Sequence, residues 1–254
     1  MILDQFKLDG RVALVTGSAS GLGQAIAVAL AEAGADVACH ARSAGQADET
    51  CRAIEQLGRR AATVKGDMSD KDTPARLVDE SVERFGRIDI LINNAGMIRR
   101  SPATEYSEED WAAVIEVNLS SVFRLSQAAG RRMIEQGSGK IVNIASLLSF
   151  QGGITVPAYT ASKSAVAGLT KALANEWAKF GVNVNAIAPG YMETKNTTPL
   201  RADETRNRQI LERIPAGRWG SPDDLAGPAV FLSSAASDYM HGHVLVVDGG
   251  WLAR

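Results

Sequence analysis

The chain has only two cysteines among its 254 residues, Cys39 and Cys51. Two cysteines are too few for a disulfide framework, and their spacing does not match a metal-binding pattern. No metal site is therefore expected. A reducing, cytoplasmic setting is the default expectation for a chain with so few cysteines.

Long apolar runs and an excess of one charge are also missing. No apolar stretch reaches the roughly 18–20 residues that cross a bilayer. The first dozen residues, MILDQFKLDGRV, contain charges where a secretory signal would be apolar. The formal net charge of -2 gives no electrostatic reason to expect binding to nucleic acid or to a membrane surface. Nucleic acids and membranes are therefore not expected as partners.

Short β-branched runs alternate with longer amphipathic stretches along almost the whole chain. The expected strands are 11–16, 35–41, 61–66, 88–93, 139–145, 183–188 and 243–248. The expected helices are 22–33, 46–57, 70–85, 107–136, 158–180 and 222–234. Several of the strands are apolar almost without a polar break, which is typical of a parallel sheet covered on both faces. This order predicts a single, doubly wound α/β domain over residues 1–254, with a Rossmann-type parallel sheet of about seven strands.

Residues 191–221 form the one irregular insert in this pattern, and they contain Pro199 and Pro215. The insert is polar and too long for an ordinary connection. Segments of this kind are often active-site lids or are disordered. We therefore expect a substrate loop at about 191–221.

A glycine-rich turn, 16–23, follows the first expected strand and leads into a helix. Glycines at such a turn let the backbone approach a pyrophosphate, which then lies at the N-terminus of the helix. The spacing is G-x-x-x-G-x-G and not the common G-x-G-x-x-G, and a tight β-to-α turn alone would also use glycine here. The position of the turn after the first of several alternating strands favours a nucleotide site.

The ends of the second and third expected strands bear on the choice of cofactor. Ala41 stands where an acidic residue would bond the ribose 2′-hydroxyl of NAD, and Arg42 follows it. An arginine can accept the 2′-phosphate of NADP, so NADP is favoured and NAD is the alternative. Asp67 is placed to receive the adenine amino group, although capping of a helix near Asp70 would explain it equally well. The turn at 93–96 can hold neighbouring strand ends and leave room for a flat ring, or it can be a plain turn.

A serine, a tyrosine and a lysine are expected at the carboxyl edge of the sheet, where open α/β sheets bind ligands. Ser146 follows an expected strand, Tyr159 and Lys163 lie four residues apart at the start of a helix, and Asn118 lies in the helix before that strand. A nearby ammonium and a helix N-terminus both favour a phenolate, so Lys163 is expected to lower the pKa of Tyr159. Ser146 could hydrogen-bond the reacting oxygen. The pair could also be an exposed helix face.

A serine-hydrolase charge relay does not fit the sequence. The three histidines, His40, His241 and His243, fall on or beside strands without a matching acid. Ser146 also lacks the sequence of a nucleophile elbow.

The motifs 16–23, 93–96, 159–163 and 189–190, taken with Asn118 and Ser146, resemble the short-chain dehydrogenase/reductase family over nearly the whole chain. The resemblance implies a nicotinamide cofactor and a homotetramer. It implies that Tyr159 is the acid/base, that Ser146 orients the substrate oxygen, that Lys163 binds the nicotinamide ribose, and that Asn118 holds a water. With the residue-level arguments above, the expected cofactor site is Gly17, Ser20, Gly21, Leu22, Gly23, Arg42, Asp67, Met68, Asn94, Ala95, Gly96, Tyr159, Lys163, Pro189, Gly190, Met192 and Thr194.

Arg99 and Arg100 follow the turn at 93–96, near the expected crevice, and a guanidinium can bind a carboxylate with two hydrogen bonds. Two surface arginines would also fit this position. Longer stretches, including NNAGMIRR, SFQGGITVPAYTASKS and VDGGWLAR, resemble the branch of the family that acts on deoxy keto-sugar acids of the 2-dehydro-3-deoxy-D-gluconate type, in uronate and pectin breakdown. Members of that branch are mostly NAD-linked, whereas Arg42 in this sequence suits NADP. The expected substrate contacts are Arg99, Arg100, Ser146, Gln151 and Tyr159.

Three alternatives remain at this stage. Two are related reductases, a gluconate 5-dehydrogenase and a 3-oxoacyl-carrier-protein reductase. The latter would need a basic docking patch, for which Arg99, Arg100, Arg131 and Arg132 are available. The third is a dinucleotide-sensing scaffold without turnover. The presence of Ser146, Tyr159 and Lys163 together argues against a scaffold, because a sensor needs only the binding half of the site.

Overall fold

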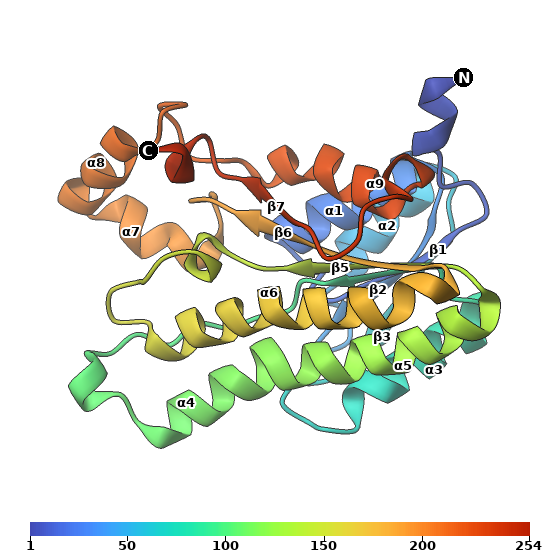
Figure 1. The fold of residues 1–254 in the computed structure, drawn as a ribbon, viewed down its shortest axis with the longest axis horizontal. Coiled ribbons are helices and arrows are strands. Elements are labelled where there is room, and N and C mark those ends of the chain that lie inside the picture. Colours follow the sequence, from blue (N-terminus) through green and yellow to red (C-terminus); the bar gives the residue numbers. More distant parts are fainter.

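Seven parallel strands form one sheet in the computed structural model, which describes residues 1–254. Their order across the sheet is β3-β2-β1-β4-β5-β6-β7 (Figure 1). The strands are β1 (Val12–Val15), β2 (Asp36–Ala41), β3 (Ala61–Lys65), β4 (Ile90–Asn93), β5 (Gly139–Ile144), β6 (Val182–Pro189) and β7 (Val244–Val247). The predicted doubly wound, Rossmann-type sheet is confirmed.

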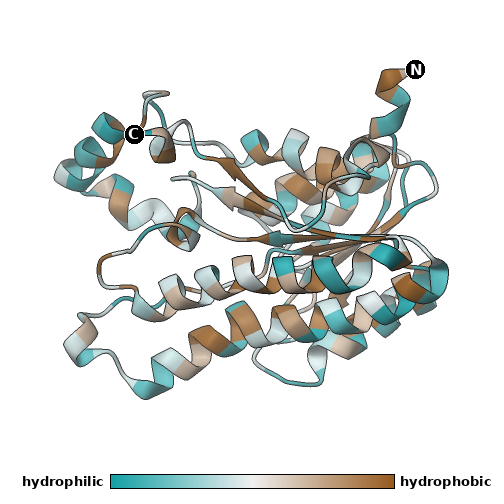
Figure 2. Ribbon diagram, in the orientation of Figure 1, coloured by the Kyte–Doolittle hydropathy of each residue, from teal (hydrophilic) through white to brown (hydrophobic).

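Helices cover both faces of this sheet (Figure 1). One layer consists of α1 (Gly21–Glu32), α2 (Asp48–Gln56) and α9 (Ala226–Ser233). The other consists of α3 (Thr73–Phe85), α4 (Glu108–Ile115), α5 (Ser121–Gln136) and α6 (Pro157–Trp177). Each layer has its own buried apolar cluster against the sheet. Figure 2 shows the apolar residues concentrated on the central strands, as expected for strands buried on both faces.

The strand order reverses between β1 and β4, which lie next to each other in the sheet. A crevice opens beyond the carboxyl ends of parallel strands at such a reversal, because the connections on either side lead away to opposite faces. The glycine-rich turn after β1 and the turn at 93–96 after β4 therefore border one crevice. None of the helices combines the length and the apolar composition needed to span a bilayer.

Three elements differ from the expectation. The helix expected over 107–136 is interrupted by a π-helical turn, Glu116–Ser120. The helix expected from residue 70 begins at Thr73, because the Asp70 carboxylate accepts a hydrogen bond from the Asp72 N–H and forms a turn there. The insert 191–221 contains two helices, α7 (Thr198–Ala202) and α8 (Glu204–Arg213), which lie beyond the carboxyl edge of the sheet (Figure 1).

Candidate active site

The turn between β1 and α1 has a backbone that needs glycine. Gly17 and Gly21 have φ values of +65° and +59°, in the left-handed region. A Cβ atom on Gly23 would lie 2.2 Å from the Gly17 carbonyl oxygen. The loop therefore passes close to the start of α1, and it leaves that helix N-terminus open to an anion.

Asn94 fastens this loop to the end of β4. Its Nδ2 atom donates to the carbonyl oxygens of Thr16 (2.8 Å) and Gly17 (3.2 Å). The Thr16 hydroxyl accepts from the backbone N–H groups of Asn94 (2.9 Å) and Ala95 (3.0 Å). The two sides of the crevice are thus held together by hydrogen bonds between neighbouring strand ends.

Arg42 and Asp67 lie near each other at the ends of β2 and β3. Arg42 is exposed, and its charge helps to lower the pKa of Asp67. The larger causes of that lowering are hydrogen bonds that the carboxylate accepts from the N–H (2.9 Å) and the hydroxyl (2.7 Å) of Ser69. Asp67 does not cap α3, which begins at Thr73. Met68, next in the chain, is buried in the core and carries no polar group.

The π-helical turn Glu116–Ser120 positions Asn118, whose side chain is fully buried. Its Oδ1 atom accepts from the Met97 N–H (2.8 Å), and its Nδ2 atom donates to the Met97 carbonyl oxygen (2.9 Å). The same Nδ2 atom donates to the Ser162 hydroxyl (3.2 Å), which in turn donates to the Tyr159 carbonyl oxygen (2.8 Å). Asn118 therefore links the segment after β4 to the first turn of α6. π-helical turns are frequent at functional sites.

At the start of α6, Lys163 is buried and Tyr159 is half-buried. Burial raises the pKa of Tyr159, while a hydrogen bond with Ser146 and the charge of Arg100 act to lower it. Burial alone lowers the pKa of Lys163 to about 8. The Lys163 Nζ atom donates to the Ile144 carbonyl oxygen (2.6 Å) and lies 5.6 Å from the centre of the Tyr159 ring.

The structure excludes one alternative for this pair and corrects one expectation. It is not an exposed helix face, because Lys163 is 5% exposed. The expectation that Lys163 lowers the pKa of Tyr159 is wrong: the groups that lower it are Ser146 and Arg100, and the cost of burying a phenolate outweighs both.

Arg99 and Arg100 have different surroundings. Arg99 is 54% exposed and forms an ion pair with Asp110 (3.4 Å). Arg100 lies close enough to Tyr159 for its charge to lower the pKa of the phenol. The structure thus brings Arg100, and not Arg99, to the Ser146–Tyr159 pair. Arg132, which we considered for a basic docking patch, pairs with Asp79 on α3.

Gln151 is held by the C-terminal tail. Its Oε1 atom accepts from the Trp251 indole N–H (3.1 Å) and from Arg213 of α8 (3.4 Å), whose guanidinium stacks 4.1 Å over the Trp251 ring. The Gln151 carbonyl group is therefore already engaged. Its amide N–H group has no such partner among the hydrogen bonds of the site.

The insert packs onto the segment that bears Ser146. A buried cluster joins Ile210, Ile214 and Trp219 of the insert to Leu147 and Trp251.

The expected cofactor contacts from Pro189 to Thr194 lie at the end of β6 and in the start of the insert. Strand β6 ends at Pro189, and a Cβ atom on the following Gly190 would lie 2.6 Å from the Asp248 Cα atom. Met192 is buried and pairs with Gly220 in an isolated parallel bridge. The Thr194 N–H donates to the Thr197 hydroxyl (3.0 Å) at the start of the next turn.

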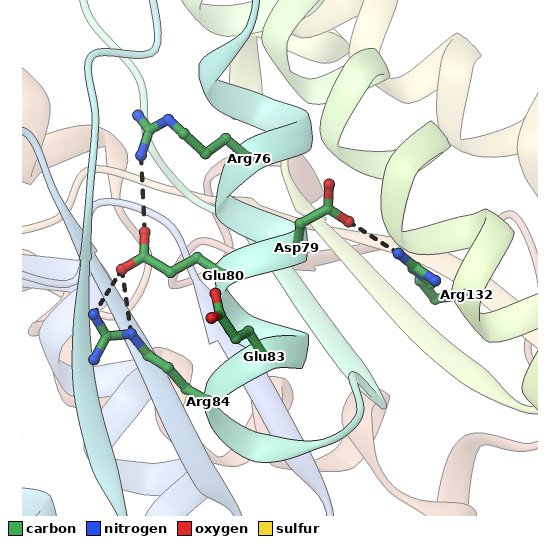
Figure 3. A pocket seen from close by; sticks show the side chains of 6 residues that line it. All are labelled: Arg76, Asp79, Glu80, Glu83, Arg84 and Arg132. Atoms are coloured by element: carbon green, nitrogen blue, oxygen red, sulfur yellow. Dashed lines mark hydrogen bonds and ion pairs between the residues drawn. The ribbon is translucent and has the colours of Figure 1, made fainter.

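A hollow with a volume of about 860 Å³ lies away from this site, between α3 and α5 (Figure 3). It is lined only by charged side chains, which are Arg76, Asp79, Glu80, Glu83, Arg84 and Arg132. Glu80 pairs with Arg76 and Arg84, and Asp79 pairs with Arg132. These are ion pairs across an open helix surface, and none of the predicted site residues lies there.

The sequence-based prediction missed two residues of the candidate active site. Ser162 was not among the expected site residues, yet it connects Asn118 to Tyr159. His40 was considered only for a charge relay, yet its ring bonds the glycine-rich turn. The one available signal was position: Ser162 lies between Tyr159 and Lys163, and His40 lies two residues before Arg42.

The chain is similar to known dehydrogenases over its whole length. Residues 17–252 match the family model described as enoyl-(acyl carrier protein) reductase. The chain is 58% identical over 255 residues to the 2-dehydro-3-deoxy-D-gluconate 5-dehydrogenase of Dickeya dadantii strain 3937, with 100% of both sequences covered.

Solved structures give the same result. A candidate 2-deoxy-D-gluconate 3-dehydrogenase from Agrobacterium tumefaciens with bound NADP has a TM-score of 0.92 and 59% identity, covering 98% of this chain and 99% of that one. A gluconate 5-dehydrogenase from Burkholderia cenocepacia in complex with NADP and tartrate has a TM-score of 0.96 and 42% identity, with 100% of both chains covered. Since the family model and these relatives span nearly all of the sequence and the fold, the chain belongs to the short-chain dehydrogenase/reductase family.

Proposed function

We propose that this chain is an NADP-linked dehydrogenase of a deoxy keto-sugar acid of the 2-dehydro-3-deoxy-D-gluconate type. It would oxidise a secondary alcohol to a ketone and catalyse the reverse reduction. The observation that carries the proposal is that Ser146 and Arg100 both lie near enough to the Tyr159 phenol to lower its pKa. The hydroxyls of Ser146 and Tyr159 suit the reacting oxygen of a substrate. The nearby Arg100 guanidinium suits the carboxylate of an acidic substrate. The name of the Dickeya relative supports the same substrate class.

The residues at the crevice fit a dinucleotide. The turn at Gly17–Gly23 and the N-terminus of α1 suit a pyrophosphate, since the loop packs so closely on Gly23 that a Cβ atom there would lie 2.2 Å from the Gly17 carbonyl oxygen. Arg42, exposed at the end of β2 with no acidic residue before it, suits a 2′-phosphate. NADP in two related structures supports this choice over NAD. We assign the remaining expected contacts, from Asn94 to Thr194, to the same cofactor site.

The bound nicotinamide ring supplies the hydride acceptor or donor, and the protein supplies the proton chemistry. In the reductive direction the Tyr159 hydroxyl gives its proton to the substrate carbonyl oxygen, and in oxidation the phenolate takes it back. Ser146 hydrogen-bonds the same oxygen and holds it against Tyr159. The raised pKa keeps Tyr159 protonated at neutral pH, which suits the reductive direction.

Lys163 and Asn118 support this proton transfer. Lys163 retains two N–H donors beyond the one given to Ile144, and these suit ribose hydroxyls. Asn118 fixes the Met97 backbone and, through Ser162, the first turn of α6. We assign it to the relay as the residue that holds a water.

For the substrate, Arg100 is the preferred carboxylate anchor, since Arg99 is paired with Asp110. Gln151 would contribute its free amide N–H group. The insert 191–221, which packs against the segment bearing Ser146, would act as the substrate loop.

We further propose a cytoplasmic homotetramer. Two buried free cysteines suit a reducing compartment, and the exposed rings of Trp111 on α4 and Phe123 on α5 suit a subunit interface. Sedimentation analysis of the purified protein measures the assembly. A monomer that persists at high concentration would contradict the tetramer.

A substrate panel tests the function. Deoxy keto-sugar acids, gluconate, uncharged sugars and a 3-oxoacyl thioester would be assayed with NAD and NADP in parallel, following the absorbance of the reduced cofactor. We expect the highest kcat/KM for a deoxy keto-sugar acid with NADP. Equal turnover of uncharged sugars, or a preference for the thioester, would overturn the substrate assignment.

A further inference from the structure

His40 lies in β2 and is 2% exposed, and its ring spans two loops at the carboxyl edge of the sheet. Its Nδ1 atom lies 3.0 Å from the backbone nitrogen of Gly17, in the glycine-rich turn. Its Nε2 atom lies 2.9 Å from the carbonyl oxygen of Gly66, just after β3. Asp67, the residue expected at the adenine, follows Gly66. One imidazole therefore ties the phosphate end of the crevice to its adenine end.

These partners determine the protonation state of the ring. A backbone N–H can only donate, so Nδ1 must present its lone pair to Gly17. A backbone carbonyl oxygen can only accept, so Nε2 must carry the hydrogen. Both hydrogen bonds exist together only in the neutral imidazole with its proton on Nε2. Protonation of Nδ1 would set two N–H groups against each other and break the bond to Gly17.

The conformation of the glycine-rich turn depends on how Gly17 is held. Its carbonyl oxygen accepts from Asn94, so a side chain of β2 and one from just after β4 hold both of its peptide groups. Gly17 also lies against Gly23 in the first turn of α1, with no room for a Cβ atom between them. The Ser18 N–H donates to the His40 carbonyl oxygen at 3.0 Å. His40 thus fixes the turn by its side chain and by its backbone.

We propose that neutral His40 is a positioning residue for NADP: it holds the glycine-rich turn in the conformation that receives the pyrophosphate, and its protonation weakens NADP binding. The inference rests on the proposed function, since it takes the turn to be the cofactor site. It makes cofactor affinity, and not the proton transfer at Tyr159, the acid-sensitive property of the enzyme.

The charges that face His40 come from the neighbouring loop and from α3. Burial lowers the pKa of His40, and the charge of Arg76 on α3 acts in the same direction. The bond to Gly66 and the charge of Asp67 act to raise it, with burial the largest effect. The ring is therefore neutral at neutral pH and titrates on the acid side.

Two substitutions separate the two hydrogen bonds. The Oδ1 atom of asparagine takes the place of Nδ1, so His40→Asn keeps an acceptor for Gly17 that cannot be protonated in this range. The Nε2 atom of glutamine takes the place of the ring Nε2, so His40→Gln keeps a donor for Gly66 and leaves the Gly17 N–H without a partner. A merely structural requirement for a polar side chain would not distinguish the two variants.

The test measures the Kd for NADP by titration calorimetry on wild type and both variants, near neutral pH and at about pH 5. Melting temperatures would be recorded alongside, to show that each variant is folded. Near neutral pH we expect His40→Asn to bind within about threefold of wild type and His40→Gln to bind about tenfold more weakly. At acid pH wild type should lose affinity relative to His40→Asn. The ionisation of NADP itself cancels in that comparison, because both proteins bind the same ligand.

The outcomes separate this inference from the proposed function. If wild type fails to bind NADP near neutral pH, the cofactor assignment is wrong. If wild type binds NADP and His40→Gln binds it equally well, or if wild type and His40→Asn show the same loss at acid pH, the positioning role of His40 is overturned.

Discussion

The Nζ atom of Lys163 donates a hydrogen bond to the carbonyl oxygen of Ile144 at 2.6 Å, and the lysine is only 5% exposed. No carboxylate forms an ion pair with this ammonium, and burial lowers its pKa to about 8. A buried ammonium held by a backbone carbonyl costs stability relative to an apolar side chain. Stability therefore does not explain the presence of Lys163 at this position.

The cost of burying Lys163 gives a measurable dependence of stability on pH. Its pKa is about 8 in the folded protein, against the ordinary value of 10.5. Between these values the unfolded chain binds more protons, so the free energy of unfolding rises with pH and the penalty disappears above 10.5. We expect wild type to gain about 3 kcal/mol relative to Lys163→Met between those two pH values. Urea unfolding of both proteins at several pH values measures this difference. A difference that does not change with pH would contradict it.

The sequence predicted where Tyr159 and Lys163 lie but not how they titrate. Spacing of four residues places two side chains on one helical face, which is a local property. Burial depends on other segments of the chain, such as the end of β5, where the Ile144 carbonyl oxygen accepts from Lys163. The direction of the Tyr159 pKa was therefore predicted wrongly, although the pairing of the two residues was correct.

The same distinction explains Asn118 and His40. Apolar periodicity predicted one helix over 107–136, because a single π-helical turn hardly disturbs that pattern. The role of His40 requires three strands in register, since it bonds loops that follow β1 and β3. The order of strands and helices along the sequence was enough to predict the seven-stranded sheet and its crevice. It was not enough to predict the contacts between loops.

Removal of the Tyr159 hydroxyl tests the proton donor. Tyr159→Phe keeps the half-buried ring and removes only its hydroxyl, the group expected to move the proton. We expect kcat to fall by at least about 100-fold, with the Kd for NADP largely unchanged. Steady-state kinetics and calorimetry measure the two quantities. Substantial remaining turnover would show that another group moves the proton.

Replacement of Arg42 tests the choice between the two cofactors. Arg42→Ala removes the exposed guanidinium beside Asp67 at the end of β2. Loss of a charge-assisted hydrogen bond predicts a rise of about 10-fold or more in the KM for NADP and little change for NAD. Arg52→Ala, on the outer surface of α2, is a control for surface charge. Equal effects on both cofactors would show that Arg42 does not bind the 2′-phosphate.

The two neighbouring arginines offer a matched pair for the substrate. Arg100→Ala should raise the KM for acidic sugars by about 10-fold or more, because its charge reaches the Ser146–Tyr159 pair. Arg99→Ala, which removes an exposed ion pair with Asp110, should leave that KM nearly unchanged. Kinetics with acidic and uncharged sugars measure the effect. If both variants keep the wild-type KM for acidic sugars, the carboxylate lies elsewhere.

The C-terminal residue offers a test of the insert as a substrate loop. The Arg254 guanidinium donates to the carbonyl oxygens of Glu212 and Arg213, which end α8. A cation at this helix terminus satisfies carbonyl groups that the helix leaves unpaired, and it complements the helix dipole. Arg254→Ala removes these bonds without touching Gln151 or Trp251. We expect a higher substrate KM, an unchanged Kd for NADP and faster proteolysis within 191–221. Arg208→Ala removes only an exposed pair within α8, so it should match wild type in all three measurements. If Arg254→Ala alters NADP binding as much as the substrate KM, the tail supports the whole crevice and the insert is not a separate substrate loop.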